Sequence, residues 1–220
     1  MTMSKQGRIN KRKTLTKMLG DSANRSEDSL NTIKTFLIIT EGVQTEVNYF
    51  KSFPLYAASV ITVIGTGFNT LSLVERANVI KQSYNAKQVE FDEAWLVFDK
   101  DSFPDQDFDN AVMSARSNGF QVAYSNESFE LWFLLHYEYL TSQISREQCI
   151  TSLTKHLGSD YKKNSTEMYN ILLPFQKTAL LNAHNLKKFQ EGKVSHDQQP
   201  VTYVVDLVEN LNMNSRNRFE

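Results

Sequence analysis

Four short apolar segments, separated by stretches of helical periodicity, constrain the fold of this chain more than any other feature. The segments cover residues 35–40, 59–64, 94–98 and 121–125. The first and third are almost continuously apolar, which is typical of strands buried on both faces of a parallel sheet. Between the segments, residues 45–53, 70–85 and 108–118 have the spacing of amphipathic helices. This alternation predicts an α/β fold with a mostly parallel sheet flanked by helices.

The pattern changes after Phe129, where helical periodicity replaces the alternation. We expect helices in residues 130–139, 146–157, 168–175, 178–189 and 201–211. Residues 31–140 are therefore predicted to form the α/β core, and residues 141–212 a helical C-terminal region packed on it. Residues 213–220 are expected to form a frayed tail.

The first 30 residues differ in composition from the rest. Six basic residues precede the first acidic one, Asp21, and few apolar residues lie among them. Residues 1–30 are therefore predicted to form a basic flexible arm. The arm is either a solvated tail or a segment that binds phosphates or a partner, with Lys11, Arg12 and Lys13 as candidate nucleic-acid contacts. The formal net charge of -1 gives the chain as a whole no attraction to nucleic acid.

Composition also excludes several classes of protein. No apolar run is long enough to cross a bilayer, and no apolar signal core follows a charged start, so no membrane partner is expected. The chain has one cysteine, Cys149, which excludes an intramolecular disulfide and a cysteine-based zinc site. We expect a cytoplasmic protein.

Carboxylates follow three of the four apolar segments. Glu41 follows the first segment, Asp99 and Asp101 follow the third, and Glu127 and Glu130 come after the fourth. Open α/β sheets place their working residues at the carboxyl ends of the strands, so these groups are expected to meet at one edge of the sheet.

Such a cluster favours a hard cation, because carboxylates repel one another unless a cation or a proton compensates. Mg²⁺ prefers oxygen ligands, and Mn²⁺ is a possible substitute. Asp99 and Asp101, one residue apart in extended chain, would point to the same side and hold the ion. Glu41 would complete the shell or act as an acid or base. A capping role for Asp99 beside a solvated Asp101 is the structural alternative.

Three motifs resemble the RloB-like family. They are Glu41-Gly42-x-x-Thr45-Glu46-x-x-Tyr49-Phe50, Phe98-Asp99-Lys100-Asp101 and Ser125-Asn126-x-x-Phe129-Glu130-x-Trp132-Phe133-Leu134-Leu135-His136. The first two motifs are common to Toprim domains, and the third is the most specific. RloB-like proteins are Toprim proteins related to OLD-type nucleases, found beside restriction systems and often with an ATPase partner. The resemblance covers most of the chain beyond the basic arm.

The resemblance implies a Toprim-like (Rossmann-like) core and a nuclease that cuts phosphodiester bonds with Mg²⁺ held by Asp99 and Asp101. It also implies a role in antiviral defence. Because the sequence contains no Walker A motif, nucleotide-driven switching would come from an ABC- or AAA-type ATPase partner. The sequence departs from the commonest Toprim pattern at Phe103, where many members carry a third acidic residue. Glu46 or Glu130 would then supply the missing catalytic carboxylate.

Substrate and assembly stay open at this point. Lys100, Lys162 and Lys163 are candidate nucleic-acid contacts, although strand alternation places Lys100 on the opposite side and the other two also fit a solvated turn. DNA, tRNA and other RNA are all possible substrates, and the chain could form a homodimer. Two alternative functions are another Toprim phosphotransferase and a Toprim-derived binding or regulatory module of an ATPase.

Overall fold

A five-stranded sheet forms the centre of the protein, in the order β2-β1-β3-β4-β5. The computed structural model describes residues 34–55, 60–68, 70–140 and 142–215. The strands are β1 (Thr35–Thr40), β2 (Val60–Gly65), β3 (Glu93–Asp99), β4 (Gln121–Asn126) and β5 (Val201–Thr202). The first four pair in parallel and β5 is antiparallel to β4. The predicted α/β fold with a mostly parallel sheet is confirmed.

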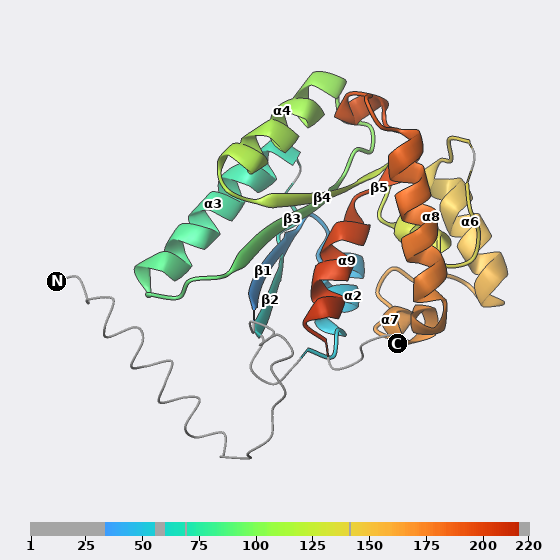
Figure 1. Cartoon of the computed structure of the whole chain (residues 1–220), viewed down its shortest axis with the longest axis horizontal. Coiled ribbons are helices and arrows are strands. Elements are labelled where there is room, and N and C mark those ends of the chain that lie inside the picture. The colour runs from blue at the N-terminus through green and yellow to red at the C-terminus, as the bar shows by residue number, and fades with distance from the viewer. Residues whose placement is uncertain (1–33, 56–59, 69, 141, 216–220) are drawn as a thin grey trace, which may run out of the picture. The chain divides into compact units, whose positions relative to one another are not determined.

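Helices cover both faces of this sheet (Figure 1). Alternate strand residues, such as Leu37 and Leu96, pack on one face against α3 (Thr70–Ala86) and α4 (Asp105–Ser117). On the other face Ile38 belongs to a second core shared with the remaining helices. These are α2 (Thr45–Lys51), α5 (Glu130–Leu134), α6 (Arg146–Leu157), α7 (Met168–Leu172), α8 (Gln176–Phe189) and α9 (Val204–Met213). Two short 3₁₀ turns, η1 (Leu173–Phe175) and η2 (Ser195–Asp197), complete the described elements. A helical C-terminal region is therefore confirmed.

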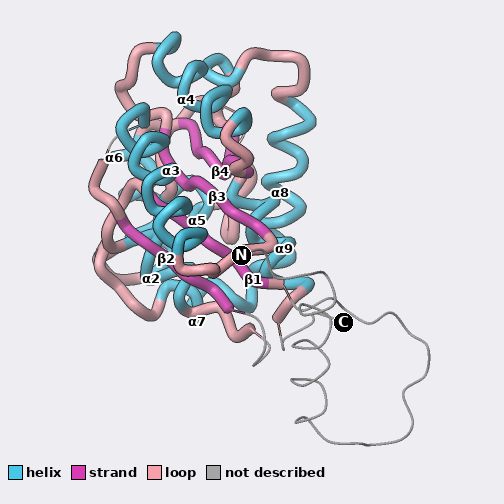
Figure 2. Tube along the Cα trace, turned by 90° about the vertical axis from the view of Figure 1, so that its left-hand side faces the viewer, coloured by secondary structure: helices cyan, strands magenta, loops and turns pink. Residues whose placement is uncertain are grey.

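Successive strands are turned relative to one another, the twist expected of such a sheet (Figure 2),. None of the helices in the described residues is long and apolar enough to cross a membrane.

The end of the C-terminal region differs from the sequence prediction. Residues 201–211 were expected to form one helix, but Val201 and Thr202 form β5 and α9 begins only at Val204. The hydroxyls of Thr202 and Ser125 share a buried hydrogen bond of 2.9 Å, which joins the added strand to β4. A strand of two residues is too short to show a period of its own, so Val201 and Thr202 before an apolar helix read as part of that helix.

The frayed tail predicted for residues 213–220 also begins too early in the chain. α9 continues to Met213, and Asn214 and Ser215 are buried. The Ser215 hydroxyl donates to the carbonyl oxygen of Pro54 at 3.1 Å, and Ser215 also forms a bridge with Leu55. The first residues of the supposed tail are thus part of the fold. Residues 216–220, like the predicted arm at 1–30, lie outside the described residues.

Candidate active site at the carboxyl ends of the strands

The neighbouring ends of β1 and β3 bring Glu41 next to Asp99. Thr40 pairs with Val97, and the Glu41 amide donates to the Val97 carbonyl oxygen at 2.9 Å. The Asp99 amide in turn donates to Glu41 Oε2 at 3.2 Å. Since β1 and β3 are adjacent parallel strands, their carboxyl ends meet, and the two carboxylates lie at one edge as the sequence indicated.

Glu46 reaches the same edge from the first turn of α2. Its carboxylate lies so close to Gly42 that a Cβ atom at Gly42 would be 2.1 Å from Glu46 Oε2. Glycine at position 42 therefore leaves the space that this carboxylate fills, which gives the Glu41-Gly42 motif a physical reason. Glu46 is only 7% exposed.

Glu130, the first residue of α5, is buried as well, with 4% exposure. The Tyr161 hydroxyl donates to Glu130 Oε1 at 3.3 Å, and Lys163 Nζ lies 3.8 Å from the same oxygen. The loop that carries both residues is fastened to α2, because the Thr45 hydroxyl donates to the Lys163 carbonyl oxygen at 2.9 Å. The structure therefore places Lys163 at the rim of the carboxylates. The neighbouring Lys162 is exposed.

Burial raises the pKa values of these carboxyls. Removal from water raises the pKa of Glu41 to about 7, and the negative charges of Glu46 and Asp101 add to this. Burial also raises the pKa of Asp99, followed by the charges of Glu46 and Glu130. The pKa of Glu46 is raised by burial and by Glu130. Each carboxyl therefore favours a proton or a cation nearby.

Such a cation comes from the start of α6. Arg146 Nη2 donates to Asp99 Oδ2 at 3.0 Å, and Arg146 Nη1 lies 3.2 Å from Asp101 Oδ2. The extended geometry expected for Asp99 and Asp101 is wrong, because Asp101 lies beyond β3 in a turn, with a φ of 43°. The shared guanidinium, rather than strand alternation, brings both carboxylates to one point.

Arg146 was missed at the sequence level. Its backbone position was visible, because Ser145 and Gln148 form a capping box that starts α6,. A capping box fixes where a helix begins but carries no information about the partner of its first side chain. The sequence therefore located the helix and not the contact.

Lys100 points away from these carboxylates. Its amine contacts Asp105 Oδ1 at 3.0 Å, donates to the Phe103 carbonyl oxygen at 2.6 Å and lies over the Phe108 ring. The residue is 8% exposed. The side chain lies on the side opposite to the carboxylates, although the chain beyond Asp99 is not extended, and in this arrangement its amine is not available to a nucleic acid.

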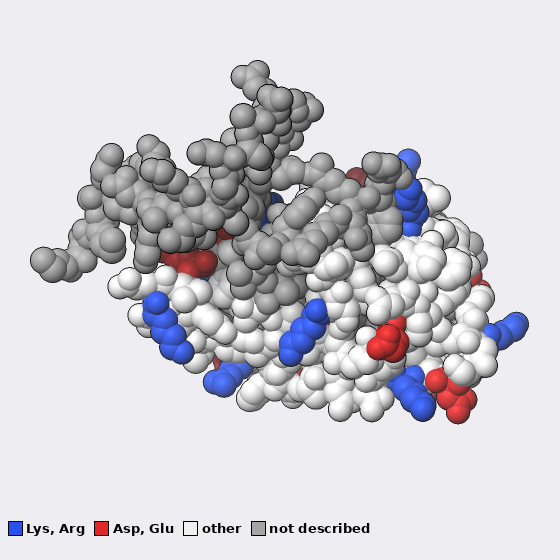
Figure 3. All heavy atoms as spheres, turned by 90° about the horizontal axis from the view of Figure 1, so that it is seen from below, with Lys and Arg blue, Asp and Glu red and all other residues white. Residues whose placement is uncertain are grey.

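Among the described residues that are visible on the face in Figure 3, the Lys and Arg side chains lie apart from one another, and one of them lies beside an acidic side chain. The remaining candidate contacts, Lys11, Arg12 and Lys13, lie outside the described residues.

The acidic side chains are of the chemical type that binds a hard divalent cation, but the distances between them in this structure are not those of a metal site. Glu41, Asp99 and Asp101 offer carboxylate oxygens alone, the ligand type that Mg²⁺ and Mn²⁺ prefer, and would be the residues to hold such an ion. Across the described ranges, however, no group of three or more His, Cys, Asp or Glu side chains is arranged to hold a metal ion. The guanidinium of Arg146 stands between two of the three donors.

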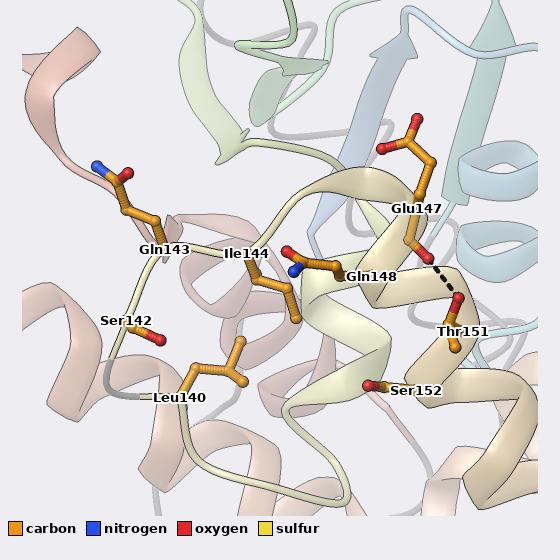
Figure 4. A pocket seen from close by; sticks show the side chains of 8 residues that line it. All are labelled: Leu140, Ser142, Gln143, Ile144, Glu147, Gln148, Thr151 and Ser152. Atoms are coloured by element: carbon orange, nitrogen blue, oxygen red, sulfur yellow. Dashed lines mark hydrogen bonds between the residues drawn. The ribbon is translucent and has the colours of Figure 1, made fainter.

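An open pocket of about 410 Å³ lies beside the start of α6. Figure 4 shows Leu140 and Ile144 turned toward each other at its wall, with Gln148 beside them. None of the carboxylates described above lines this pocket, so it is separate from the candidate site.

Comparison with known proteins gave one match. The family model described as RloB-like protein matches residues 36–211, a range that contains all the candidate residues except Lys11, Arg12 and Lys13. No curated protein and no solved structure gave a significant match.

Proposed function

The chain belongs to the RloB-like family, and on that premise we propose that it is a Mg²⁺-dependent nuclease of the Toprim type that cleaves nucleic-acid phosphodiester bonds. The observation that carries the proposal is the contact of the Asp99 amide with the Glu41 carboxylate, at an edge where Glu46 and Glu130 are also buried. Burying carboxyls together is costly unless a cation or a proton is bound. In a phosphoryl-transfer site, a bound cation would offset this cost and the buried carboxyls would serve catalysis.

A divalent ion held by Glu41, Asp99 and Asp101 would activate a water molecule and stabilise charge on the leaving oxygen. The chain's own residues would handle protons and phosphate. Where Glu41 is not a ligand of the ion, its carboxyl, whose pKa burial raises to about 7, is suited to accept or deliver a proton near neutral pH,. Lys163 is exposed at the rim and is suited to contact a phosphate,.

The setting of this activity is also a proposal. We propose a cytoplasmic antiviral effector that works with an ABC- or AAA-type ATPase, and a homodimer is one assembly open to it. The substrate class, DNA or tRNA or another RNA, is left to the experiment below.

The decisive test incubates the full chain with plasmid DNA and with total RNA in buffers that contain Mg²⁺, Mn²⁺ or EDTA. We expect cleavage of one substrate with either metal and none in EDTA. Asp99→Asn should lower the rate at least roughly 100-fold, because even residues that only orient metal ligands cost 10–100-fold when changed. Asp92→Asn, a change just before β3 at the opposite edge of the sheet, should cleave normally.

Other outcomes would point elsewhere. A protein that binds no metal and cuts neither substrate would be a binding or regulatory module of an ATPase. A protein that binds metal but only joins or extends strands would be another Toprim phosphotransferase. Full activity of Asp99→Asn would remove the carboxylate edge from the mechanism.

A further inference from the structure

We propose that Arg146 is a positioning residue that changes partners: it holds Asp99 and Asp101 in the metal-free protein and passes to a phosphate of the nucleic acid when a divalent ion takes the aspartates. This inference rests on the proposed function. It assigns a role to the one guanidinium that the described structure places against the candidate site.

The first step is competition for the same two carboxylates. The two terminal nitrogens of Arg146 contact one oxygen of Asp99 and one of Asp101, at 3.0 and 3.2 Å. A divalent ion bound to both aspartates would face the guanidinium at close range, and like charges at such separations repel strongly away from bulk water. A metal on the two aspartates therefore weakens their pairing with the guanidinium.

The second step is that Arg146 is free to leave. Its side chain is 27% exposed, and the Asp101 side chain is 39% exposed. Its Nε atom is buried yet has no hydrogen-bond partner among the described residues. The tip can therefore move while the capping box of Ser145 and Gln148 keeps the backbone in place.

The position of Arg146 in α6 supports the same idea. A cation in the first turn of a helix lies at the positive end of the helix dipole, where acidic residues are favoured. Arg146 is the first residue of α6. Its positive charge is therefore stabilised by the aspartates and not by the helix dipole. Once a metal neutralises the aspartates, an incoming anion becomes the better partner.

A phosphate is the anion that fits this position. The planar fork of a guanidinium binds two phosphate oxygens at once, as it binds the two aspartates in the metal-free state. A phosphate that shares the metal with Asp99 and Asp101 would lie beside the released guanidinium. Lys163, near Glu130, would then contribute a second cation at the rim.

Metal binding tests the competition. Isothermal titration with Mn²⁺ compares the wild type, Arg146→Met and a control, Lys187→Met, which removes a cation paired with Asp206. Arg146→Met should bind Mn²⁺ roughly tenfold more tightly, within the usual range of coupling between two linked ligands, and the control should match the wild type. Equal affinity of wild type and Arg146→Met would overturn the inference. Absence of Mn²⁺ binding in all three would instead overturn the proposed function on which it rests.

Phosphate binding tests the second partner. The probe is a fluorescent single-stranded oligonucleotide with phosphorothioate links, which resist cleavage, in deoxyribo and ribo forms. Mn²⁺ should increase its affinity for the wild type, and Arg146→Met should lose most of this increase despite binding the metal more tightly. Arg146→Lys should recover part of it. An increase in Arg146→Met equal to that of the wild type would refute the role at the phosphate.

A structure of the wild type with Mn²⁺ keeps the inference testable should Arg146→Met fail to fold. Both terminal nitrogens of Arg146 should then lie beyond hydrogen-bond distance from Asp99 and Asp101. Retained contacts with a metal bound to the same two carboxylates would overturn the exchange.

Discussion

The two parts of the candidate site are held by different kinds of contact. The acidic part, Glu41 and Asp99, is joined by backbone amides at the ends of two paired strands, from Glu41 to Val97 and from Asp99 to Glu41. The basic part, Arg146 and Lys163, comes from the C-terminal region, where Arg146 forms a side-chain ion pair with Asp99 and Lys163 one with the neighbouring Glu130. Strand register fixes the position of the acidic part, whereas the ion pairs of the basic part can be exchanged for other partners. We infer a rigid acidic part and a replaceable basic part.

The largest expected effect is on the pH dependence of stability, which follows from the charge of the acidic part. In EDTA, the folded-state pKa of Glu41 is raised by burial from 4.5 to about 7. The native state then binds more protons than the unfolded state across this interval, so the free energy of unfolding falls as the pH rises through it. This shift in the pKa of Glu41 corresponds to a loss of at most roughly 3 kcal/mol in the free energy of unfolding.

Thermal unfolding of the wild type and Glu41→Gln between about pH 4.5 and 8 measures this effect. Glu41→Gln should have a flatter profile and gain stability relative to the wild type at the alkaline end. The profile should keep some slope, because the pKa values of Asp99 and Glu46 are raised as well. Parallel profiles for the two proteins would show that Glu41 is not the group that titrates.

A smaller effect tests how tightly the acidic part is packed. In Gly42→Ala the new Cβ would lie 2.1 Å from Glu46 Oε2, so the Glu46 carboxylate must move. Overpacking of this kind costs roughly 1–3 kcal/mol, to be measured by urea denaturation. The same change in a Glu46→Ala background should cost much less. An equal cost in both backgrounds would place the conflict in the backbone instead.

The smallest effect concerns the replaceable part. Lys163 and Lys162 are adjacent and exposed, but only Lys163 lies near a site carboxylate. Lys163→Met should weaken oligonucleotide binding by a few-fold and lower the salt dependence by about one counterion. Lys162→Met is the matched control and should do less. Equal losses would indicate a general effect of charge rather than a contact at the rim.

The contrast between contacts fixed by strand ends and contacts made by single side chains also explains how much could be predicted from the sequence. Strand ends are visible because apolar segments stop where the carboxylates begin, so the edge with Glu41 and Asp99 could be located. Glu46 and Glu130 were proposed as substitutes for an acidic residue at Phe103, and both are buried at or near this edge.

Contacts made by single side chains across the chain could not be predicted. Arg146 and Asp99 are 47 positions apart, and no periodicity connects them. The turn that gives Asp101 its positive φ was likewise hidden, since an Asp-x-Asp sequence reads equally well as extended chain. β5 was missed because Val201 and Thr202, just before α9, read as a continuation of its helical pattern.

The late position of β5 in the chain has a consequence for synthesis on the ribosome. The acidic residues up to Glu130 are translated before Arg146, and all of them before Thr202 closes the edge of β4. A product terminated before residue 200 would leave the Ser125 hydroxyl without its partner and β4 as an open strand edge. Open edges pair readily with other chains. We therefore expect premature termination to yield aggregating protein rather than a partly folded, soluble one.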